Sequence, residues 1–254
     1  MKILFLGTGS AFCIKNYHSN ALILHNDKKL LVDAGSDIRF SLSEQNLSYK
    51  DIDGVYISHF HNDHTGGLEY LAFKSFFDAK KKKIKLYIHE SFVDILWENS
   101  LKASMGMIFD KQHNISDFFE IVPIKKNFIW ENICFQLIET LHVTKSNFET
   151  PVYGLLINAS QKVYITGDTR FLPDFLDKTY ELADIIIHDT ETGKEKSIIH
   201  SHFIDLKKLK PTIKEKMYLW HYQDNVTLSF VSWQKSALNN GFKGFLKKGD
   251  TIDL

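Results

Sequence analysis

Short apolar runs recur along the whole chain and predict a series of β-strands. In the first half of the chain they cover residues 2–6, 21–24, 30–33, 54–58, 84–88 and 118–123. In the second half they cover residues 128–130, 133–138, 152–157 and 162–165, with further runs that begin at 185 and 217. The runs at 118–123, 128–130 and 133–138 follow one another closely, so we expect them to form a meander. Turn residues separate most of the runs, as at Asn26-Asp27, which predicts a hairpin there.

Helical spacing of apolar residues appears between several of these strands. It predicts helices over residues 38–45, 66–79 and 90–102, the second with Leu68, Leu71, Ala72 and Phe76 on one face. Strands that alternate with helices in both halves, together with hairpins, predict a layered α/β fold. The chain contains no internal repeat and no linker rich in Pro, Gly or Ser. We therefore expect one domain over residues 1–254.

Composition narrows the class of protein but does not identify it. Lys+Arg and Asp+Glu both number 31, so the formal net charge is zero and stable nucleic-acid binding is not expected. The lysine run at 80–83 is expected to be a solvated face. The two cysteines, Cys13 and Cys134, are far apart in the sequence, and we expect both to be reduced thiols. The apolar run at 3–6 is too short for a signal peptide or a membrane span, so we expect no membrane association and a cytoplasmic location.

The densest candidate chemistry follows the strand predicted at 54–58. Within six residues, His59, His61, Asp63 and His64 offer three imidazoles and a carboxylate. In extended backbone the side chains of His59 and His61 project to the same side of the chain. Asp63 and His64 follow where Thr65-Gly66-Gly67 predict a turn, so their side chains can point in a second direction. Nitrogen and oxygen ligands of this kind suit zinc or a similar divalent ion. The two directions in which they point indicate two ions.

Further candidate ligands lie at the ends of other predicted strands. His142, Asp168 and His221 each follow an apolar run, and open α/β sheets place ligand-binding groups at strand ends. We expect His59, His61 and His142 to hold the first ion, and Asp63, His64 and His221 to hold the second. Asp168 would bridge them through its two oxygens. Asp33, also at a strand end, either caps the following segment or orients a metal-bound histidine.

In its motifs the chain resembles the metallo-β-lactamase superfamily. Its H-x-H-x-D-H pattern appears as His59–His64, and a later histidine, aspartate and histidine follow in the expected order as His142, Asp168 and His221. The resemblance extends from L-G-T-G-S at 6–10 to the closing G-D-T-I-D at 249–253. It implies a four-layer αβ/βα sandwich with a metal site at one edge between the sheets. The L-G-T-G-S start, the V-D-A-G turn and the H-Y at 221–222 are most similar to the branch that contains tRNase Z and phosphodiesterases.

The same resemblance implies a catalytic pair in addition to the metal ligands. In this branch an acidic residue after a strand pairs with a later histidine, and Asp189 and His200 match that pattern, with His202 as the alternative histidine. His200 would donate a proton or a hydrogen bond to the departing oxygen, and Asp189 would orient it. Asp63 is counted both as a ligand and as a catalytic residue. Two cations that share a water would lower its pKa toward neutrality, so that hydroxide attacks phosphorus.

The choice of substrate depends on one interval in the chain. tRNase Z enzymes carry a long basic arm between the third histidine and the bridging aspartate, but here that interval is 26 residues (168 − 142). It is filled by residues 142–147, a turn, and the predicted strands at 152–157 and 162–165. The chain thus resembles armless cyclic-nucleotide phosphodiesterases such as the anti-Pycsar enzymes. This implies hydrolysis of small 3′,5′-cyclic nucleotides such as cCMP and cUMP to nucleoside 5′-monophosphates. A tRNA 3′-processing endoribonuclease and a non-catalytic metal-binding scaffold are the alternatives.

The resemblance also implies cofactors and an assembly. We expect two divalent ions per chain, zinc with manganese as the alternative, and a homodimer. The region from 90 to 119, with Trp97, Met105, Met107 and Phe109, is a candidate lid that would supply apolar walls for a base.

Overall fold

The computed structural model describes residues 1–80, 82–145 and 148–254, and it describes no side chains between 144 and 150. Lys81 of the lysine run and residues 146–147 of the segment before the predicted strand at 152–157 lie outside the described residues. Within the described part of the chain, the strands form two seven-stranded sheets and a short two-stranded ribbon. None of the described helices has the length and apolar content needed to span a bilayer.

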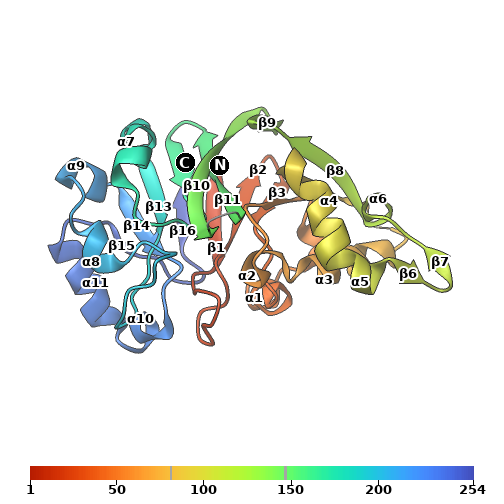
Figure 1. Ribbon diagram of the computed structural model, residues 1–254, viewed down its shortest axis with the longest axis horizontal. Coiled ribbons are helices and arrows are strands. Elements are labelled where there is room, and N and C mark those ends of the chain that lie inside the picture. The colour runs from red at the N-terminus through yellow and green to blue at the C-terminus, as the bar shows by residue number, and fades with distance from the viewer. Residues whose placement is uncertain (81, 146–147) are drawn as a thin grey trace.

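The first sheet contains the N-terminal half of the chain and is closed at one edge by the last strand. Its strands, in spatial order, are β16 (Thr251–Asp253), β1 (Lys2–Gly7), β2 (Asn20–His25), β3 (Lys28–Val32), β4 (Gly54–Ile57), β5 (Ile84–His89) and β8 (Phe119–Ile124). Its helical segments are α1 (Ile38–Glu44), η1 (Tyr49–Asp51), α2 (Asn62–Thr65), α3 (Leu68–Phe76), η2 (Glu90–Phe92), α4 (Val93–Leu96), η3 (Trp97–Leu101), α5 (Lys102–Met105) and α6 (Ile115–Phe118). The ribbon of β6 (Met107–Ile108) and β7 (Lys111–Gln112) projects beyond them (Figure 1).

The second sheet contains the C-terminal half. Its strands, in spatial order, are β15 (Gly244–Phe245), β14 (Met217–Trp220), β13 (Ile185–Asp189), β12 (Lys162–Ile165), β11 (Phe148–Asn158), β10 (Ile133–Lys145) and β9 (Asn127–Trp130). Its helices are α7 (Pro173–Leu182), α8 (Phe203–Leu206), α9 (Pro211–Lys214), α10 (Asp224–Leu228) and α11 (Phe230–Asn239). They lie together on the side of the molecule away from the first sheet (Figure 1).

Alternation along the strands produces three separate cores. In β4, Tyr56 packs between the two sheets, whereas Val55 and Ile57 pack under the helices of the first sheet. In β12, Val163 packs between the sheets and Tyr164 packs under the helices of the second sheet. Successive side chains of a strand point to opposite faces, so both faces of each sheet are buried. This gives the four-layer αβ/βα sandwich that the sequence predicts.

One expectation about the middle of the chain is wrong. β8 does not join a meander with β9 and β10, because it pairs in parallel with β5 in the first sheet while β9 and β10 pair in the second. Residues 90–105 form helical turns, and of the four apolar residues named in the candidate lid over 90–119, Met107 and Phe109 are exposed. Trp97 and Met105 are buried in the core under the first sheet. Apolar periodicity predicts that a segment is a strand or a helix, but it does not specify which partner the segment packs against.

The ends of strands from both sheets meet at one edge. Asp33 follows β3, His59 follows β4, Asp168 follows β12 and His221 follows β14, while Asp189 ends β13. Parallel neighbours such as β12, β13 and β14 finish at the same edge, so their terminal residues lie close together. All the candidate site residues therefore come from segments that end at this edge or pass it.

Candidate active site

Two groups of ligand atoms lie side by side at this edge of the sandwich. The first group consists of His59, His61, His142 and Asp168, and the second of Asp63, His64, Asp168 and His221. In each group the ligand atoms all lie within 4.8 Å of one another. Both groups contain Asp168, so one side chain belongs to both.

The two oxygens of Asp168 face different groups. Oδ2 lies 3.6 Å from the Nε2 atoms of both His59 and His142. Oδ1 lies 3.3 Å from the Nε2 atoms of both His64 and His221. A carboxylate arranged in this way presents one oxygen to each group, as a bridge between two cations requires.

The spacing within each group matches a small metal ion. In the first group, Nδ1 of His61 lies 3.1 Å from Nε2 of His59 and 3.2 Å from Nε2 of His142. In the second group, Oδ2 of Asp63 lies 3.2 Å from Nε2 of His64 and 3.3 Å from Nε2 of His221. Zinc binds nitrogen and oxygen at roughly 2.0–2.2 Å, so the ligands of a tetrahedral site are about 3.4 Å apart. The donor atoms therefore have the separation that a tetrahedral ion needs.

Hydrogen bonds outside the two groups fix the histidine rings. Nδ1 of His142 donates to the carbonyl oxygen of Ile199 at 2.6 Å, and Nδ1 of His64 donates to Oδ2 of Asp33 at 2.8 Å. Nδ1 of His59 lies 3.0 Å from the hydroxyl of Ser58, which itself donates to Asp33. With Nδ1 protonated, the Nε2 lone pair of each ring is directed into the site. Asp33 thus lies behind the ligands and orients them, and Asp37 rather than Asp33 precedes helix α1.

Two of these residues have an unusual backbone conformation. Asp33 has φ of 60° and His221 has φ of 59°, in the left-handed region. Such conformations are uncommon for residues other than glycine and tend to occur at functional sites. In both cases the chain leaves a strand and turns the side chain into the cluster.

His142 reaches the cluster in a different way from that predicted. The sequence predicts it at the end of a strand, but β10 continues to Lys145. The pairing of β10 with β11 shifts register between Leu141 and Val143, so His142 lies at a β-bulge. A bulge redirects a side chain without ending the strand. No local signal in the sequence marks this position.

Asp189 and His200 form a pair beside the two groups. Nδ1 of His200 donates to Oδ2 of Asp189 at 2.8 Å, and the Thr169 amide donates to the same oxygen at 2.9 Å. Nδ1 of His221 lies 3.2 Å from Oδ1 of Asp189, so this carboxylate contacts both histidines. His202 does not face the cluster: its Nε2 bonds to the carbonyl oxygen of Gly193 and its Nδ1 accepts from the Ile204 amide.

The electrostatics of the cluster favour positive charge in the second group. Burial lowers the pKa of His59 well below its usual value and lowers that of His142 to about 4. For His64, burial also acts to lower the pKa, but nearby carboxylates, led by Asp168, outweigh it and raise the pKa well above its usual value. The lowered pKa values favour neutral imidazoles in the first group, which are suitable as ligands, and the carboxylates of the second group attract a cation.

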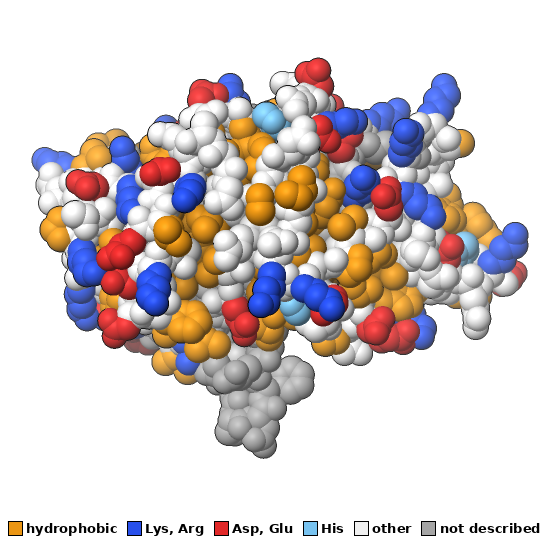
Figure 2. Space-filling view, turned by 90° about the horizontal axis from the view of Figure 1, so that it is seen from above, with side chains coloured by type: hydrophobic (Ala, Val, Ile, Leu, Met, Phe, Trp, Pro, Cys, Tyr) orange, Lys and Arg blue, Asp and Glu red, His pale blue; other side chains and the backbone are white. Residues whose placement is uncertain are grey.

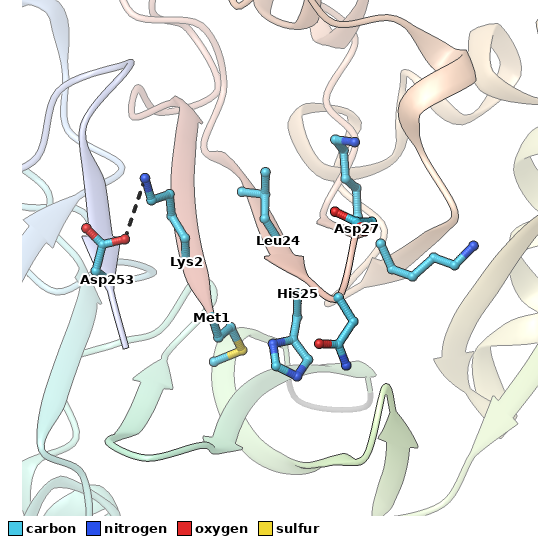
Figure 3. Close-up of a pocket in the computed structure, with 9 residues that line it drawn as sticks. Met1, Lys2, Leu24, His25, Asp27 and Asp253 are labelled. Carbon is cyan, nitrogen blue, oxygen red and sulfur yellow. Dashed lines mark ion pairs between the residues drawn. The ribbon is translucent and has the colours of Figure 1, made fainter.

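A cavity of about 340 Å³ opens over the two groups. It is lined by Ala11, Phe12, His61, Asn62, Asp63, His142, Asp168, Ile199 and His200. A second hollow, of about 380 Å³, lies at the other end of β1 and contains Met1, Lys2, His25 and Asp253 (Figure 3). Its Lys2–Asp253 ion pair is solvent-exposed, and the hollow holds none of the clustered ligand groups. The candidate chemistry is therefore in the cavity beside Asp168.

The chain is similar to known proteins over nearly its whole length. A family model described as "Anti-Pycsar protein Apyc1" matches residues 1–252. A protein of that name from Paenibacillus harenae is 32% identical over 233 residues, which cover 89% of this chain and 91% of the relative. Another from Bacillus phage vB_BveM-Goe7 is 33% identical over 239 residues, covering 89% and 90%.

Solved structures have the same fold at lower sequence identity. The metallo-β-lactamase fold protein YhfI from Bacillus subtilis superposes with a TM-score of 0.74 at 17% identity, covering 99% of each chain. The short form of human tRNase Z superposes with a TM-score of 0.70 at 17% identity, covering 100% of this chain and 99% of that one. The metallo-β-lactamase fold predicted from the sequence is thus confirmed.

Proposed function

The chain belongs to the anti-Pycsar Apyc1 family, and from that premise we propose that it is a metal-dependent hydrolase of 3′,5′-cyclic nucleotides. Its substrates would be cyclic mononucleotides such as cCMP and cUMP, and its products nucleoside 5′-monophosphates. The observation that carries the proposal is the position of His200, which is hydrogen-bonded to Asp189 and lines the same cavity as Asp63, His142 and Asp168. The cavity thus combines candidate metal ligands with a candidate proton donor.

We propose two divalent cations per chain, zinc with manganese as the alternative. Four buried carboxylates, Asp33, Asp63, Asp168 and Asp189, are at most 4% exposed. Their ion-pair partners in the described part of the chain are histidines. Buried carboxylates need compensating charge, and two divalent ions would supply it. When bound, such ions neutralise charge on phosphoryl oxygens and make water a stronger acid.

His200 is the proposed general acid. In hydrolysis, a P–O bond to water forms, the P–O3′ ester bond breaks, and O3′ needs a proton to leave as a hydroxyl. Burial acts to lower the pKa of His200, but Asp189 outweighs it and raises the pKa above its usual value. His200 can thus carry a proton on Nε2, and the proton that water loses restores it.

Asp63 and Asp189 have supporting roles in this proposal. Asp189, whose pKa is lowered to about 2 by the net effect of His200 over burial, stays ionised and holds the His200 ring. Asp63 borders the cavity and is the proposed acceptor for a proton of the attacking water. It would do this while its Oδ2 faces His64 and His221.

Small size and balanced charge favour a mononucleotide over a long RNA. The cavity volume of about 340 Å³ is at the lower end of the range for small-molecule sites. One broad face of the molecule mixes Lys and Arg with Asp and Glu rather than forming a continuous basic surface (Figure 2). Binding of a long polyanion depends on many cationic contacts.

The test compares cyclic mononucleotides with an RNA. Metal-loaded protein is incubated with cCMP, cUMP, cAMP, cGMP and, separately, a 3′-extended pre-tRNA, and the products are resolved by chromatography. We expect nucleoside 5′-monophosphates from the cyclic nucleotides, an intact pre-tRNA, and no turnover by Asp168→Ala. Cleavage of the pre-tRNA alone would assign the chain to the tRNA-processing class, and no cleavage of any substrate would favour a scaffold.

A further inference from the structure

The most exposed large apolar side chain in the described part of the molecule is at the proposed active site. Phe12 is 95% exposed, yet it lines the cavity beside Asp168. An exposed phenylalanine gains little from the fold of its own chain, because the hydrophobic effect rewards burial. A ring left free at the edge of a cavity can instead be covered by a ligand.

Hydrogen bonds from the residues that follow Phe12 hold its loop in place. The Cys13 amide donates to the carbonyl oxygen of Ser10 at 3.0 Å, and the Cys13 thiol donates to the carbonyl oxygen of Tyr222 at 3.0 Å. On the other side, the amides of Ile14 and Lys15 donate to the carboxylate of Asp224 at 3.0 and 3.1 Å. Binding a ligand against the ring would therefore require little ordering of the loop.

The remaining lining of the cavity leaves few groups to read a base by hydrogen bonding. The histidines and aspartates there are the proposed ligands and proton donor, and the only other polar side chain among the lining residues is that of Asn62. Ala11, Phe12 and Ile199 are apolar. Apolar contact and ring stacking are therefore the main means of recognising a base in this cavity, and they are available to every base.

We infer that the ring of Phe12 is the surface on which the nucleobase stacks, and that it sets affinity without selecting among bases. This inference rests on the proposed hydrolysis of cyclic nucleotides and adds to it a specificity-determining residue. Phe12, unlike the residues from 90 to 119, is among those that line the cavity of this chain. Phe12 acts on binding and takes no part in proton transfer.

The test uses Phe12→Ala and Phe12→Tyr, with Ile14→Ala as the matched control. Ile14 is on the same loop and is 83% exposed, but it is not among the residues that line the cavity. Loss of one stacked base costs roughly 5- to 150-fold in affinity. We expect Phe12→Ala to raise KM for all four cyclic mononucleotides by about that factor with little change in kcat. Phe12→Tyr should retain the wild-type KM, as should Ile14→Ala.

Two further substrates separate stacking from other effects. A methyl ribofuranoside 3′,5′-cyclic phosphate has the reacting group without a base, and its hydrolysis, followed by 31P NMR, should be the same in Phe12→Ala as in the wild type. A phosphorothioate analogue of 2-aminopurine riboside 3′,5′-cyclic phosphate should lose fluorescence when it binds the wild type, and the quenching should be much weaker with Phe12→Ala.

The outcomes distinguish this inference from the proposed function. Suppose that the wild type hydrolyses cyclic nucleotides. If Phe12→Ala then leaves KM unchanged, or raises KM for the baseless substrate as much as for the nucleotides, the stacking assignment is wrong and the proposed function stands. If the wild type hydrolyses no cyclic nucleotide, the proposed function fails. The fluorescence titration then decides the role of Phe12: quenching lost in Phe12→Ala supports it, and equal or absent quenching overturns it.

Discussion

Replacing Asp33 by asparagine tests whether the residues behind the metal ligands control the site. The Asp33 carboxylate accepts three hydrogen bonds of 2.8 Å: two from Ser58, through its amide and its hydroxyl, and one from Nδ1 of His64. Asparagine has the same shape and tolerates the left-handed backbone at φ of 60°. We therefore expect Asp33→Asn to fold.

The structure sets the size of the effect. The asparagine oxygen can replace one acceptor, for the Ser58 amide, and its NH₂ group then faces the Ser58 hydroxyl and His64. To accept from that NH₂, the His64 ring must move its proton to Nε2, which lies 3.2 Å from Asp63 and 3.3 Å from Asp168. A protonated Nε2 cannot bind a metal. Loss of such orienting partners costs roughly 10- to 100-fold in metal affinity, about 1.4–2.8 kcal/mol.

The assay is a zinc competition titration against a chromophoric chelator, in which two binding steps are resolved. Asp33→Asn should weaken the step that belongs to Asp63, His64 and His221 and leave the other nearly unchanged. The matched control is Ser58→Ala, which removes the hydroxyl 3.0 Å from Nδ1 of His59 and keeps the bond between Asp33 and His64. It should weaken the other step. If Asp33→Asn binds two zinc ions with wild-type affinity, the assigned role of Asp33 is refuted.

Three further predictions follow from named contacts. Asp168→Ala should reduce bound metal from two equivalents to less than one by elemental analysis, since each oxygen faces one group; retention of both ions would contradict the bridge. His200→Ala should lower kcat on cyclic nucleotides by roughly 100- to 10,000-fold with metal content unchanged, and much less on a p-nitrophenyl phosphodiester, whose leaving group needs no proton; equal losses would exclude the acid role. Tyr180→Phe should cost about 1–3 kcal/mol in urea unfolding, because it leaves Nε2 of buried His188 without the hydroxyl 2.7 Å away. Tyr164→Phe should cost nothing, since no described group bonds its buried hydroxyl; a similar loss in both would show that ring packing is responsible.

The sequence identified much of the candidate site because its signals are local. Four of the candidate ligands fall between His59 and His64, and the direction of each follows from the change from strand β4 to helix α2. Asp168 and His221 follow apolar runs that end in a turn, which places them at an edge of a sheet wherever the sheet lies. The apolar runs that alternate with helices likewise predict mixed α/β layers, whereas the four-layer sandwich was implied by the family resemblance.

Tertiary structure decided what depends on partners distant in sequence. The register shift at His142 exists only because β10 pairs with β11, and the choice of His200 over His202 depends on which ring reaches Asp189. The same is true of β8, which pairs with β5 in the first sheet although β9 and β10 follow it directly in the chain. Local sequence patterns determine whether a segment forms a strand or a helix and which face of it a side chain occupies. Both properties depend on steric limits and burial within a few neighbouring residues. Which groups then come within hydrogen-bonding distance depends on how the two sheets pack, and many distant residues determine that packing together.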